Sequence, residues 1–354
     1  MLVLGIESTC DETGVALVED GRRIVTQRVL SQVPIHQRFG GVVPELASRA
    51  HVENVTQLLD QVLTETGLDP AAPAIDLIAV ANRPGLIGSL LVGLTAAKSL
   101  ALSWNVPLVG VDHVHAHIYS TSLRSPETEE TGTETGTGTG PQLPAVSLVV
   151  SGGHTALYLS KSWTEHQLLG STNDDAVGEA FDKVAAILGL GYPGGPAISR
   201  IASAGNSKST RFPRTLLGAD SLDFSFSGIK TAVLYRAKGQ NAPRSGPLTP
   251  GVQVADVAAA FEEAVVDVLI TKLRRAIRRQ DVRCALVAGG VAANNRLRSR
   301  LAELAEQEQL DVFYPPLELC TDNAAMIAGL GYHRFQNGTR HDLSLDAYPM
   351  MERS

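Results

Sequence analysis

The sequence predicts a duplicated α/β fold, in which two similar halves each form a mixed, mostly parallel sheet covered by helices. Apolar runs of strand length alternate with amphipathic helical stretches along most of the chain. The order of three strands followed by alternating helices and strands occurs twice, and a segment of different composition separates the two occurrences. The length of 354 residues is sufficient for two domains with well-filled cores.

The first half begins with a short apolar run of the kind found in buried strands. Pro44 falls in the first turn of a long amphipathic helix, where its missing N–H group costs no hydrogen bond. We expect strands at 2–6, 14–18, 23–31, 75–81 and 107–111, and helices at 42–65, at 87–103 and from 113 onward.

The second half repeats this order after a Gly/Thr/Glu-rich segment at 124–144, which cannot bury enough apolar surface to offset its ordering entropy and is expected to be a flexible loop. The expected domains are an N-terminal lobe at 1–123 and a C-terminal lobe at 145–354. In the second lobe we expect strands at 145–150, 155–160, 166–169, 284–288 and 310–314, and helices at 175–188, 197–204, 254–279, 292–306 and 321–332.

This arrangement, two duplicated lobes with a central cleft, is the plan of the actin, Hsp70 and sugar-kinase ATPases, and it indicates little about the reaction. The composition is that of a globular protein, with 44% apolar and 19% charged residues. The 30 Lys and Arg against 37 Asp and Glu give a net charge of −7, which excludes a protein that coats nucleic acid by bulk charge but leaves room for a local basic patch.

The cysteines and the N-terminus favour a reduced, cytoplasmic protein. Cys10, Cys284 and Cys320 are far apart and form no Cys-x-x-Cys pair, which argues against a disulfide framework and against a cysteine zinc site. Glu7 interrupts the first apolar run too early for a signal peptide. We find no run of about 18 apolar residues, and we expect no membrane partner.

Two short turns between apolar strands carry hydroxyl and glycine residues, at 7–13 (ESTCDET) and at 151–155 (SGGHT). Each turn alone is most simply an ordinary hairpin turn. Their equivalent places in the two halves favour a second interpretation, in which exposed backbone N–H groups bind phosphate or another anion.

Three of the nine histidines lie in the string DHVHAH. In a helix His113 and His117, four residues apart, point the same way, whereas His115 points elsewhere. A helix-capping or core role is the plain alternative for a single histidine. The best third ligand is Asp322, which otherwise is an ordinary carboxylate at a helix N-terminus. Two imidazoles and one carboxylate suit Fe²⁺ or Zn²⁺ rather than Mg²⁺ or Ca²⁺.

Further signals are weaker. The string AGGVAAN at 288–294 joins a strand to a helix, where paired glycines let a ligand approach the backbone. The basic run near the end of the 254–279 helix, together with arginines on the next helix, is more often a solvated face than a phosphate site.

Taken together, these strings resemble the tRNA N6-adenosine threonylcarbamoyltransferases, the TsaD family, of bacterial type. The matching strings follow one another in order over almost the whole chain: 5–14 (GIESTCDETG), 41–50 (GVVPELASRA), 84–93 (PGLIGSLLVG), 113–117, 151–155, 178–183 (GEAFDK), 192–196 (YPGGP), 224–232 (FSFSGIKTA), 289–298 (GGVAANNRLR) and 320–325 (CTDNAA). Two residues depart from the family pattern: Arg83 precedes Pro-Gly-Leu where members often carry Gly, and Ser199 stands where some members have an acidic residue linked to a ribose-type contact.

The resemblance implies a set of site residues. The metal ligands would be His113, His117 and Asp322, with Fe²⁺ expected ahead of Zn²⁺. The expected substrate contacts are Val149, Val150, Ser151, Gly152, Gly153, Asp182, Gly195 and Asn294. The resemblance also implies transfer of a threonylcarbamoyl group from its adenylate to N6 of adenosine 37 in tRNAs that read ANN codons, with release of AMP. We expect Asp11, in the first turn, to be the general base.

The implied partners are tRNA, threonylcarbamoyl-AMP, a smaller inactive paralogue and a P-loop ATPase. An ATP-dependent kinase or ATPase of the same fold is the main alternative, although it needs an Mg²⁺ site that two histidines fit poorly. A metalloprotease is disfavoured because the string lacks His-Glu-x-x-His, and a non-catalytic scaffold is disfavoured because it needs no metal triad.

Overall fold

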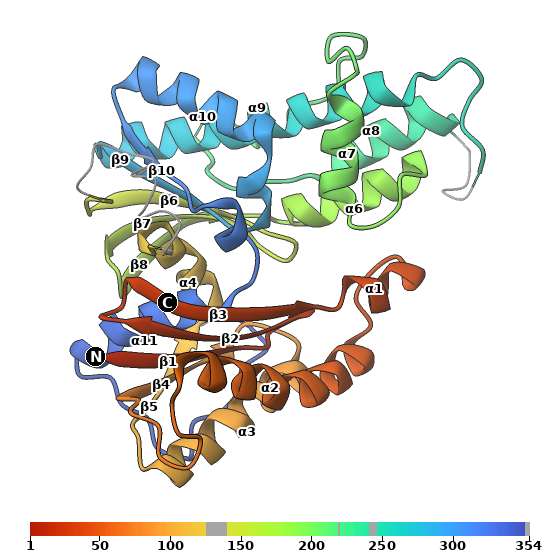
Figure 1. Ribbon diagram of the computed structural model, residues 1–354. Coiled ribbons are helices and arrows are strands. Elements are labelled where there is room, and N and C mark those ends of the chain that lie inside the picture. The colour runs from red at the N-terminus through yellow and green to blue at the C-terminus, as the bar shows by residue number, and fades with distance from the viewer. Residues whose placement is uncertain (125–139, 219, 241–245, 351–354) are drawn as a thin grey trace. The chain divides into compact units, whose positions relative to one another are not determined.

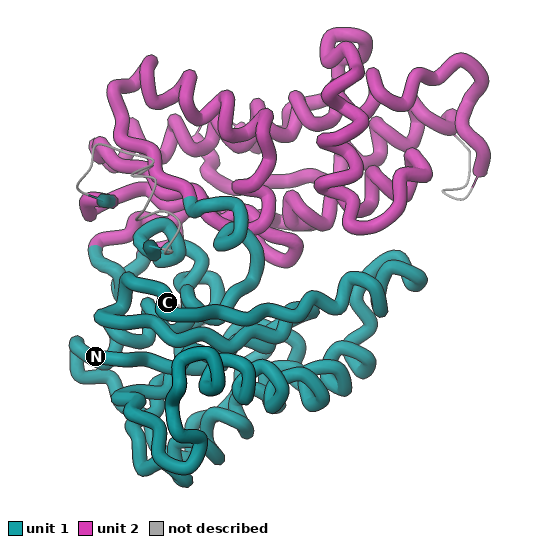
Figure 2. The backbone as a smooth tube through the Cα atoms, in the orientation of Figure 1, with its two compact units in different colours: residues 1–140, 162–166, 315–354 teal, residues 141–161, 167–314 magenta. Residues whose placement is uncertain are grey.

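The computed structural model describes residues 1–124, 140–218, 220–240 and 246–350, and these divide into two compact units (Figures 1 and 2). Unit 1 contains the described residues of Met1–Gly140, Ser162–His166 and Pro315–Ser354. Unit 2 contains those of Pro141–Lys161 and Gln167–Tyr314. Most of the segment predicted to be a loop at 124–144 lies outside the described residues.

Unit 1 is built on a five-stranded sheet with the order β3-β2-β1-β4-β5. β1 pairs antiparallel with β2, and β2 with β3, whereas β4 and β5 continue the sheet in parallel. The strands are β1 Leu2–Glu7, β2 Glu12–Glu19, β3 Arg23–Ser31, β4 Leu77–Arg83 and β5 Leu108–Asp112; the helices are α1 Val33–His36, α2 Pro44–Thr66, α3 Ile87–Trp104, α4 His113–Tyr119 and α11 Ala324–Gln336, with 3₁₀ turns η1 Gln37–Phe39, η2 Ser120–Ser122 and η4 Leu317–Leu319.

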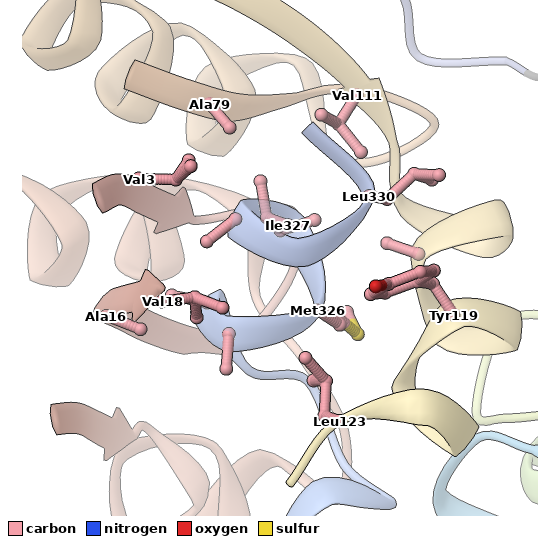
Figure 3. Close-up of a cluster of buried hydrophobic side chains, with 14 of the residues drawn as sticks. Val3, Ala16, Val18, Ala79, Val111, Tyr119, Leu123, Met326, Ile327 and Leu330 are labelled. Atoms are coloured by element: carbon pink, nitrogen blue, oxygen red, sulfur yellow. The ribbon is translucent and has the colours of Figure 1, made fainter. Parts of the chain in front are cut away.

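Both faces of this sheet are buried, and successive side chains along each strand point to opposite faces. Leu4 and Ile6 of β1 pack with α2 and α3 in one hydrophobic cluster. Val3 packs on the opposite face with α11 and with Tyr119 of α4 in a second cluster (Figure 3). Gly5 allows the close approach of α11, since a Cβ there would collide with the Ala324 carbonyl.

Unit 2 repeats the sheet of unit 1, with the order β10-β9-β6-β7-β8. β6 pairs antiparallel with β7 and parallel with β9. The strands are β6 Ala145–Val150, β7 Thr155–Ser162, β8 Glu165–Ser171, β9 Cys284–Ala288 and β10 Asp311–Phe313; the helices are α6 Val177–Leu188, α7 Gly194–Ala202, α8 Ser227–Lys238, α9 Val254–Gln280 and α10 Asn295–Glu308, with the 3₁₀ turn η3 Gly290–Ala293. The duplicated α/β architecture is therefore confirmed, and the central cleft stays a prediction.

The unit boundaries differ from the predicted lobes at the C-terminus. The sequence places residues 145–354 in the second lobe, but Ser162–His166 and residues 315–350 belong to unit 1. The reason is packing, because the buried face of α11, which includes Met326 and Ile327, completes the core against β1, β2 and β4. A second difference is α8, which the sequence did not predict.

Within the described residues, α3 alone is long and apolar enough to span a membrane by length and composition, a test that core helices also pass. Its buried face, which includes Leu90, Leu94 and Ala97, packs in the α2–α3 cluster of unit 1. This packing is that of a core helix.

Candidate functional site

The two candidate metal-binding histidines lie on α4, directly after β5. Asp112 caps this helix, since its Oδ1 accepts hydrogen bonds from the backbone N–H groups of Val114, at 2.9 Å, and His115, at 3.1 Å. The cap starts the helix at His113, so that His113 and His117 are one turn apart on one side. Their ring centroids are 4.7 Å apart.

Asp322, which precedes α11, completes the group. Its Oδ1 lies 3.1 Å from Nε2 of His117 and 3.5 Å from Nε2 of His113. The ligand atoms of the three residues all lie within 4.8 Å of one another. The predicted convergence of two neighbouring histidines and a distant aspartate is therefore present, and all three residues belong to unit 1.

The surroundings of His113 determine which ring nitrogen faces this group. Glu7 is fully buried, and its Oε2 lies 2.9 Å from Nδ1 of His113. Because an ionised carboxylate only accepts hydrogen bonds, Nδ1 carries a hydrogen, and Nε2 is the ring nitrogen that faces Asp322 and would offer its electron pair to a cation in place of a second proton. A histidine whose outer nitrogen is held by a carboxylate is the usual arrangement of a metal ligand.

The donor set fits a cation. The two Nε2 atoms and a carboxylate oxygen face one another, and such acceptor atoms repel unless protons or a cation lie between them. His117 is fully buried, and its Nδ1 has no hydrogen-bond partner in the part of the chain that the structure describes. Burial alone lowers the pKa of His113, but the Glu7 and Asp322 carboxylates outweigh it and raise this pKa to about 10. The negative potential at the site thus favours a positive charge.

Sequence reasoning missed Glu7, although it lies in one of the strings that carry the family resemblance. Its other carboxylate oxygen accepts a 2.6 Å hydrogen bond from the backbone N–H of Thr9, which fixes the side chain at the end of β1. The available signal was an acidic residue closing an otherwise apolar strand, a position where an unpaired charge is costly.

The turn after β1 contains the predicted general base, Asp11. Its side chain is partly exposed, and its backbone carbonyl accepts a hydrogen bond from the Gln32 N–H. The neighbouring Glu12 differs, because burial and the Asp322 and Asp11 carboxylates raise its pKa well above the ordinary value. The base role of Asp11 stays a prediction.

His115 points away from the metal group, as its place in the helix predicts. Its ring lies 4.4 Å from that of His166, centroid to centroid. His115 is not among the residues whose ligand atoms converge on Asp322.

The predicted substrate contacts all lie in unit 2. Val149 and Val150 end β6, and the turn at Ser151, Gly152 and Gly153 follows. Hydrogen bonds between Ser151 and His154 close this turn, while the N–H groups of Gly152 and Gly153 have no partner among the described residues. Free amides in a tight turn can bind an anion.

Neighbouring elements approach this turn through glycines. The Gly178 N–H donates to the Ser151 carbonyl, and a Cβ at Gly289 would lie 2.5 Å from the carbonyl oxygen of Val150. Since β6 and β9 are parallel, Ser151 and Gly289 follow the carboxyl ends of adjacent strands. This edge is where ligands bind in α/β sheets.

Asp182 lies on α6, Gly195 lies on α7, and Asn294 directly precedes α10. Asp182 Oδ1 accepts a 2.6 Å hydrogen bond from the Gly194 N–H and so ties α6 to the start of α7, where Gly195 has open space around it. Asn294 caps α10, with its Oδ1 accepting from the Leu297 N–H at 2.8 Å.

A groove of about 810 Å³ lies between α7, α9 and the start of α10, all within unit 2. Its polar lining includes Ser199, Arg200, Glu262, Asn295 and Arg296. The volume is in the range of small-molecule sites.

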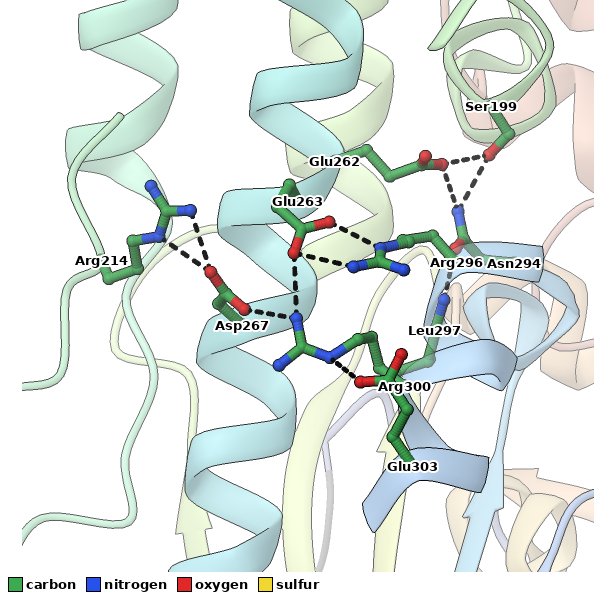
Figure 4. A network of polar contacts seen from close by, with 10 residues as sticks. All are labelled: Ser199, Arg214, Glu262, Glu263, Asp267, Asn294, Arg296, Leu297, Arg300 and Glu303. Atoms are coloured by element: carbon green, nitrogen blue, oxygen red, sulfur yellow. Dashed lines mark hydrogen bonds and ion pairs between the residues drawn. The ribbon is translucent and has the colours of Figure 1, made fainter. Parts of the chain in front are cut away.

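Most arginines of the basic run are ion-paired. Arg296 and Arg300 bind Glu263, and Arg278 binds Glu308 at 2.6 Å (Figure 4 shows the first network). This pairing agrees with the interpretation of a solvated, structural face.

Arg83, one of the two departures from the family, stacks its guanidinium 4.6 Å from the Tyr348 ring centroid.

Solved structures of low sequence identity share this duplicated α/β fold. An activator of 2-hydroxyisocaproyl-CoA dehydratase from Clostridium difficile aligns with a TM-score of 0.52 at 12% identity, covering 96% of this chain and 97% of that one. Full-length HypF aligns with a TM-score of 0.58 at 12% identity, covering 95% of this chain and 46% of that one. At these identities the likeness concerns the fold alone.

The sequence comparisons are more specific. A model of the TsaD family, described as tRNA N6-adenosine threonylcarbamoyltransferase, matches residues 23–329. Proteins with that name from Anaeromyxobacter dehalogenans and Thermomicrobium roseum are 48% and 49% identical over 348 and 365 residues, with 98% of this chain covered in both cases and 98% and 96% of the relatives. The chain belongs to the TsaD family.

Proposed function

We propose that this protein transfers the threonylcarbamoyl group of threonylcarbamoyl-AMP to N6 of adenosine 37 in tRNAs that read ANN codons. Membership in a family of acyltransferases supports this reaction. The observation that carries it is the convergence of His113, His117 and Asp322, backed by the buried Glu7. In the reaction the bond from the carbamoyl carbon to the phosphate oxygen breaks, a bond from that carbon to N6 forms, and AMP and a proton leave.

The residues of unit 1 would hold the cation and accept the proton. His113, His117 and Asp322 are its ligands, and Glu7 orients the first of them. A divalent cation bound there would supply Lewis-acid stabilisation of the negative charge that develops on the acyl group. N6 of adenosine is a weak nucleophile because its lone pair is delocalised into the ring, so a base is needed as the bond forms. We assign that role to Asp11.

The residues of unit 2 would bind the adenylate. The free N–H groups of Gly152 and Gly153 suit an oxyanion such as the phosphate. Val149, Val150 and Ser151 shape that turn, and the side chain of Asp182 and the open space at Gly195 border the path of the nucleotide. Holding the reacting atoms in place in this way can contribute about 7–11 kcal/mol relative to a bimolecular reaction.

Partners, metal and location complete the proposal. Because the net charge is −7, the chain alone should bind tRNA weakly, and a smaller inactive paralogue and a P-loop ATPase would extend the binding surface. We propose Fe²⁺, with Zn²⁺ as the alternative, and a cytoplasmic location. Metal analysis of protein purified without oxygen distinguishes the two ions.

The decisive experiment incubates the purified chain and its partners with threonylcarbamoyl-AMP and tRNA, and measures modified adenosine by mass spectrometry of nucleosides. We expect modified adenosine and AMP in equal amounts with the wild type and neither with His113→Ala. Formation of ADP from ATP by this chain, without modified adenosine, would instead favour the kinase or ATPase alternative.

A further inference from the structure

A buried polar network next to the turn at 7–13 has no assigned role. Thr13 of β2, Gln32 before α1, His36 of α1 and His51 of α2 are each at most 1% exposed. All four residues belong to unit 1. Burial of a polar side chain is unfavourable unless it is hydrogen-bonded, so the partners of these four residues show what the network holds.

The ring of His51 bridges two points of this turn. Its Nε2 lies 3.0 Å from the Cys10 carbonyl oxygen, and its Nδ1 lies 2.8 Å from the Thr13 hydroxyl oxygen. Because a carbonyl oxygen only accepts hydrogen bonds, Nε2 carries the hydrogen. Burial lowers the pKa of His51, which favours the neutral ring and leaves Nδ1 as the acceptor for the Thr13 O–H group.

These contacts hold the main chain on both sides of Asp11. The Cys10 carbonyl directly precedes Asp11, and Thr13 follows after Glu12. The carbonyl of Asp11 itself accepts a 2.8 Å hydrogen bond from the Gln32 N–H. The second half of the turn is therefore attached to α2 and to the residue that precedes α1.

A different histidine holds the first half of the same turn. Glu7 Oε2 and Thr9 Oγ1 lie 2.9 Å and 3.2 Å from Nδ1 of His113, a candidate metal ligand. The turn is thus attached near its start to the metal group and near its end to His51. Because Asp11 lies between these attachments, loss of the second one would let its carboxylate move relative to the metal group.

Gln32 extends the network to the start of α2. Its amide oxygen accepts from His36 Nε2 at 3.1 Å, and His36 Nδ1 accepts from the Val43 N–H at 3.3 Å. The Gln32 amide nitrogen lies 3.4 Å from the Ala47 carbonyl oxygen and 3.4 Å from His51 Nε2. Gln32 therefore packs against His51 and helps to keep its ring in place.

We infer that His51 and Thr13 are positioning residues, which hold the turn so that the Asp11 carboxylate reaches the amine that is acylated. Both side chains are fully buried, so they act on the reaction only through the turn. The inference rests on the proposed function, because it takes Asp11 as the base. It deepens that proposal by adding the residues that set the position of the base.

The test measures kcat and KM of the full-length chain with its partners, threonylcarbamoyl-AMP and tRNA. Thr13→Val removes the hydroxyl group and keeps the shape of the side chain. We expect kcat to fall about 10- to 100-fold, as a displacement of up to about 1 Å can cause. KM for threonylcarbamoyl-AMP should stay the same, because the predicted adenylate contacts belong to unit 2. Thr13→Ser, which keeps the hydroxyl group, should restore the wild-type kcat.

Thr26→Val is a matched control in the same sheet. The Thr26 hydroxyl donates to Glu65 on the surface at 2.8 Å, and its loss should leave kcat unchanged. Thermal melting detects a variant that does not fold. If Thr13→Val fails in this way, His51→Gln replaces it, and we expect the same fall in kcat with an unchanged KM.

A double variant tests whether the two residues act through Asp11. Since Asp11→Asn already removes the carboxylate, adding Thr13→Val should slow this protein little further. An equal fall in both backgrounds, or a folded single variant with the wild-type kcat, overturns the inference and leaves the proposed reaction intact. If Asp11→Asn alone has a near-normal kcat, the base role and the inference are both wrong. If the wild type forms no modified adenosine, the proposed function itself is wrong.

Discussion

Changing Glu7 to Gln tests whether the carboxylate behind His113 sets the affinity for metal. Both oxygens of Glu7 accept hydrogen bonds, one from His113 Nδ1 at 2.9 Å and the other from the Thr9 N–H at 2.6 Å. Glutamine keeps the shape but replaces one oxygen with an NH₂ group. That group then faces another donor, either at His113 or at Thr9, in a fully buried place.

The expected loss is about 10- to 100-fold in metal affinity, which corresponds to about 1.4–2.7 kcal/mol. The measurement strips the protein with a chelator and then titrates Zn²⁺ against a fluorescent competing chelator. Glu65→Gln is a matched control in unit 1, because Glu65 accepts from Thr26 and Arg28 on the surface and does not contact the metal group.

A Glu7→Gln protein that melts like the wild type and binds Zn²⁺ with unchanged affinity would refute this reasoning. The same change should leave AMP binding unaltered, because the predicted adenylate contacts belong to unit 2. If Zn²⁺ binding and AMP binding were lost together, the cause would be general unfolding rather than an effect on His113.

Three further changes give distinct outcomes. Gly5→Ala should destabilise the protein by about 3 kcal/mol in urea unfolding, because the added methyl group collides with backbone of α11; a normal midpoint contradicts that packing. Burial opposes ionisation of Asp175, but hydrogen bonds from Lys183 and Lys230 outweigh it and lower its pKa below 3.8. The wild type should therefore be about 1–3 kcal/mol more stable than Asp175→Asn at pH 7, and this difference should disappear as the pH falls through the lowered pKa; a difference that persists at pH 2 contradicts the pairing. Asp11→Asn should lower kcat about 10²- to 10⁴-fold, whereas near-normal turnover at saturating substrates removes Asp11 from the base role.

Local patterns were sufficient to predict the sheets. The strands at 23–31, 145–150 and 284–288 have the predicted bounds, because each is an extended run bordered by polar or turn residues. The sequence did not predict α8 because the string FSFSGIKTA, where this helix begins, contains serines, a glycine and β-branched residues, which favour a helix only weakly. Packing of Ile229, Val233 and Ala237 in the core supplies what propensity does not.

Pairing across the chain was only partly predictable. The spacing of His113 and His117 marks a pair of ligands, since helix geometry fixes their relation. Nothing local joins Glu7 to a histidine 106 residues away, or Thr13 to His51, 38 residues further along the chain. Sequence motifs therefore indicate which residues gather, whereas the hydrogen-bond partners show what holds each of them in place.

The core of unit 1 explains how the ligand geometry is maintained. α4 and α11, which carry or adjoin the three ligands, pack in one hydrophobic cluster on a single face of the sheet (Figure 3). Tyr119, in the last turn of α4, lies in this cluster, and its hydroxyl is 2.8 Å from the Gly21 carbonyl oxygen and 2.9 Å from His333 Nε2 of α11. Because buried side chains are closely packed, this arrangement restricts movement of α4 relative to α11. Metal affinity is therefore a property of unit 1. It should be unchanged in Glu262→Gln, a change in unit 2, but should fall when the Tyr119 side chain is truncated.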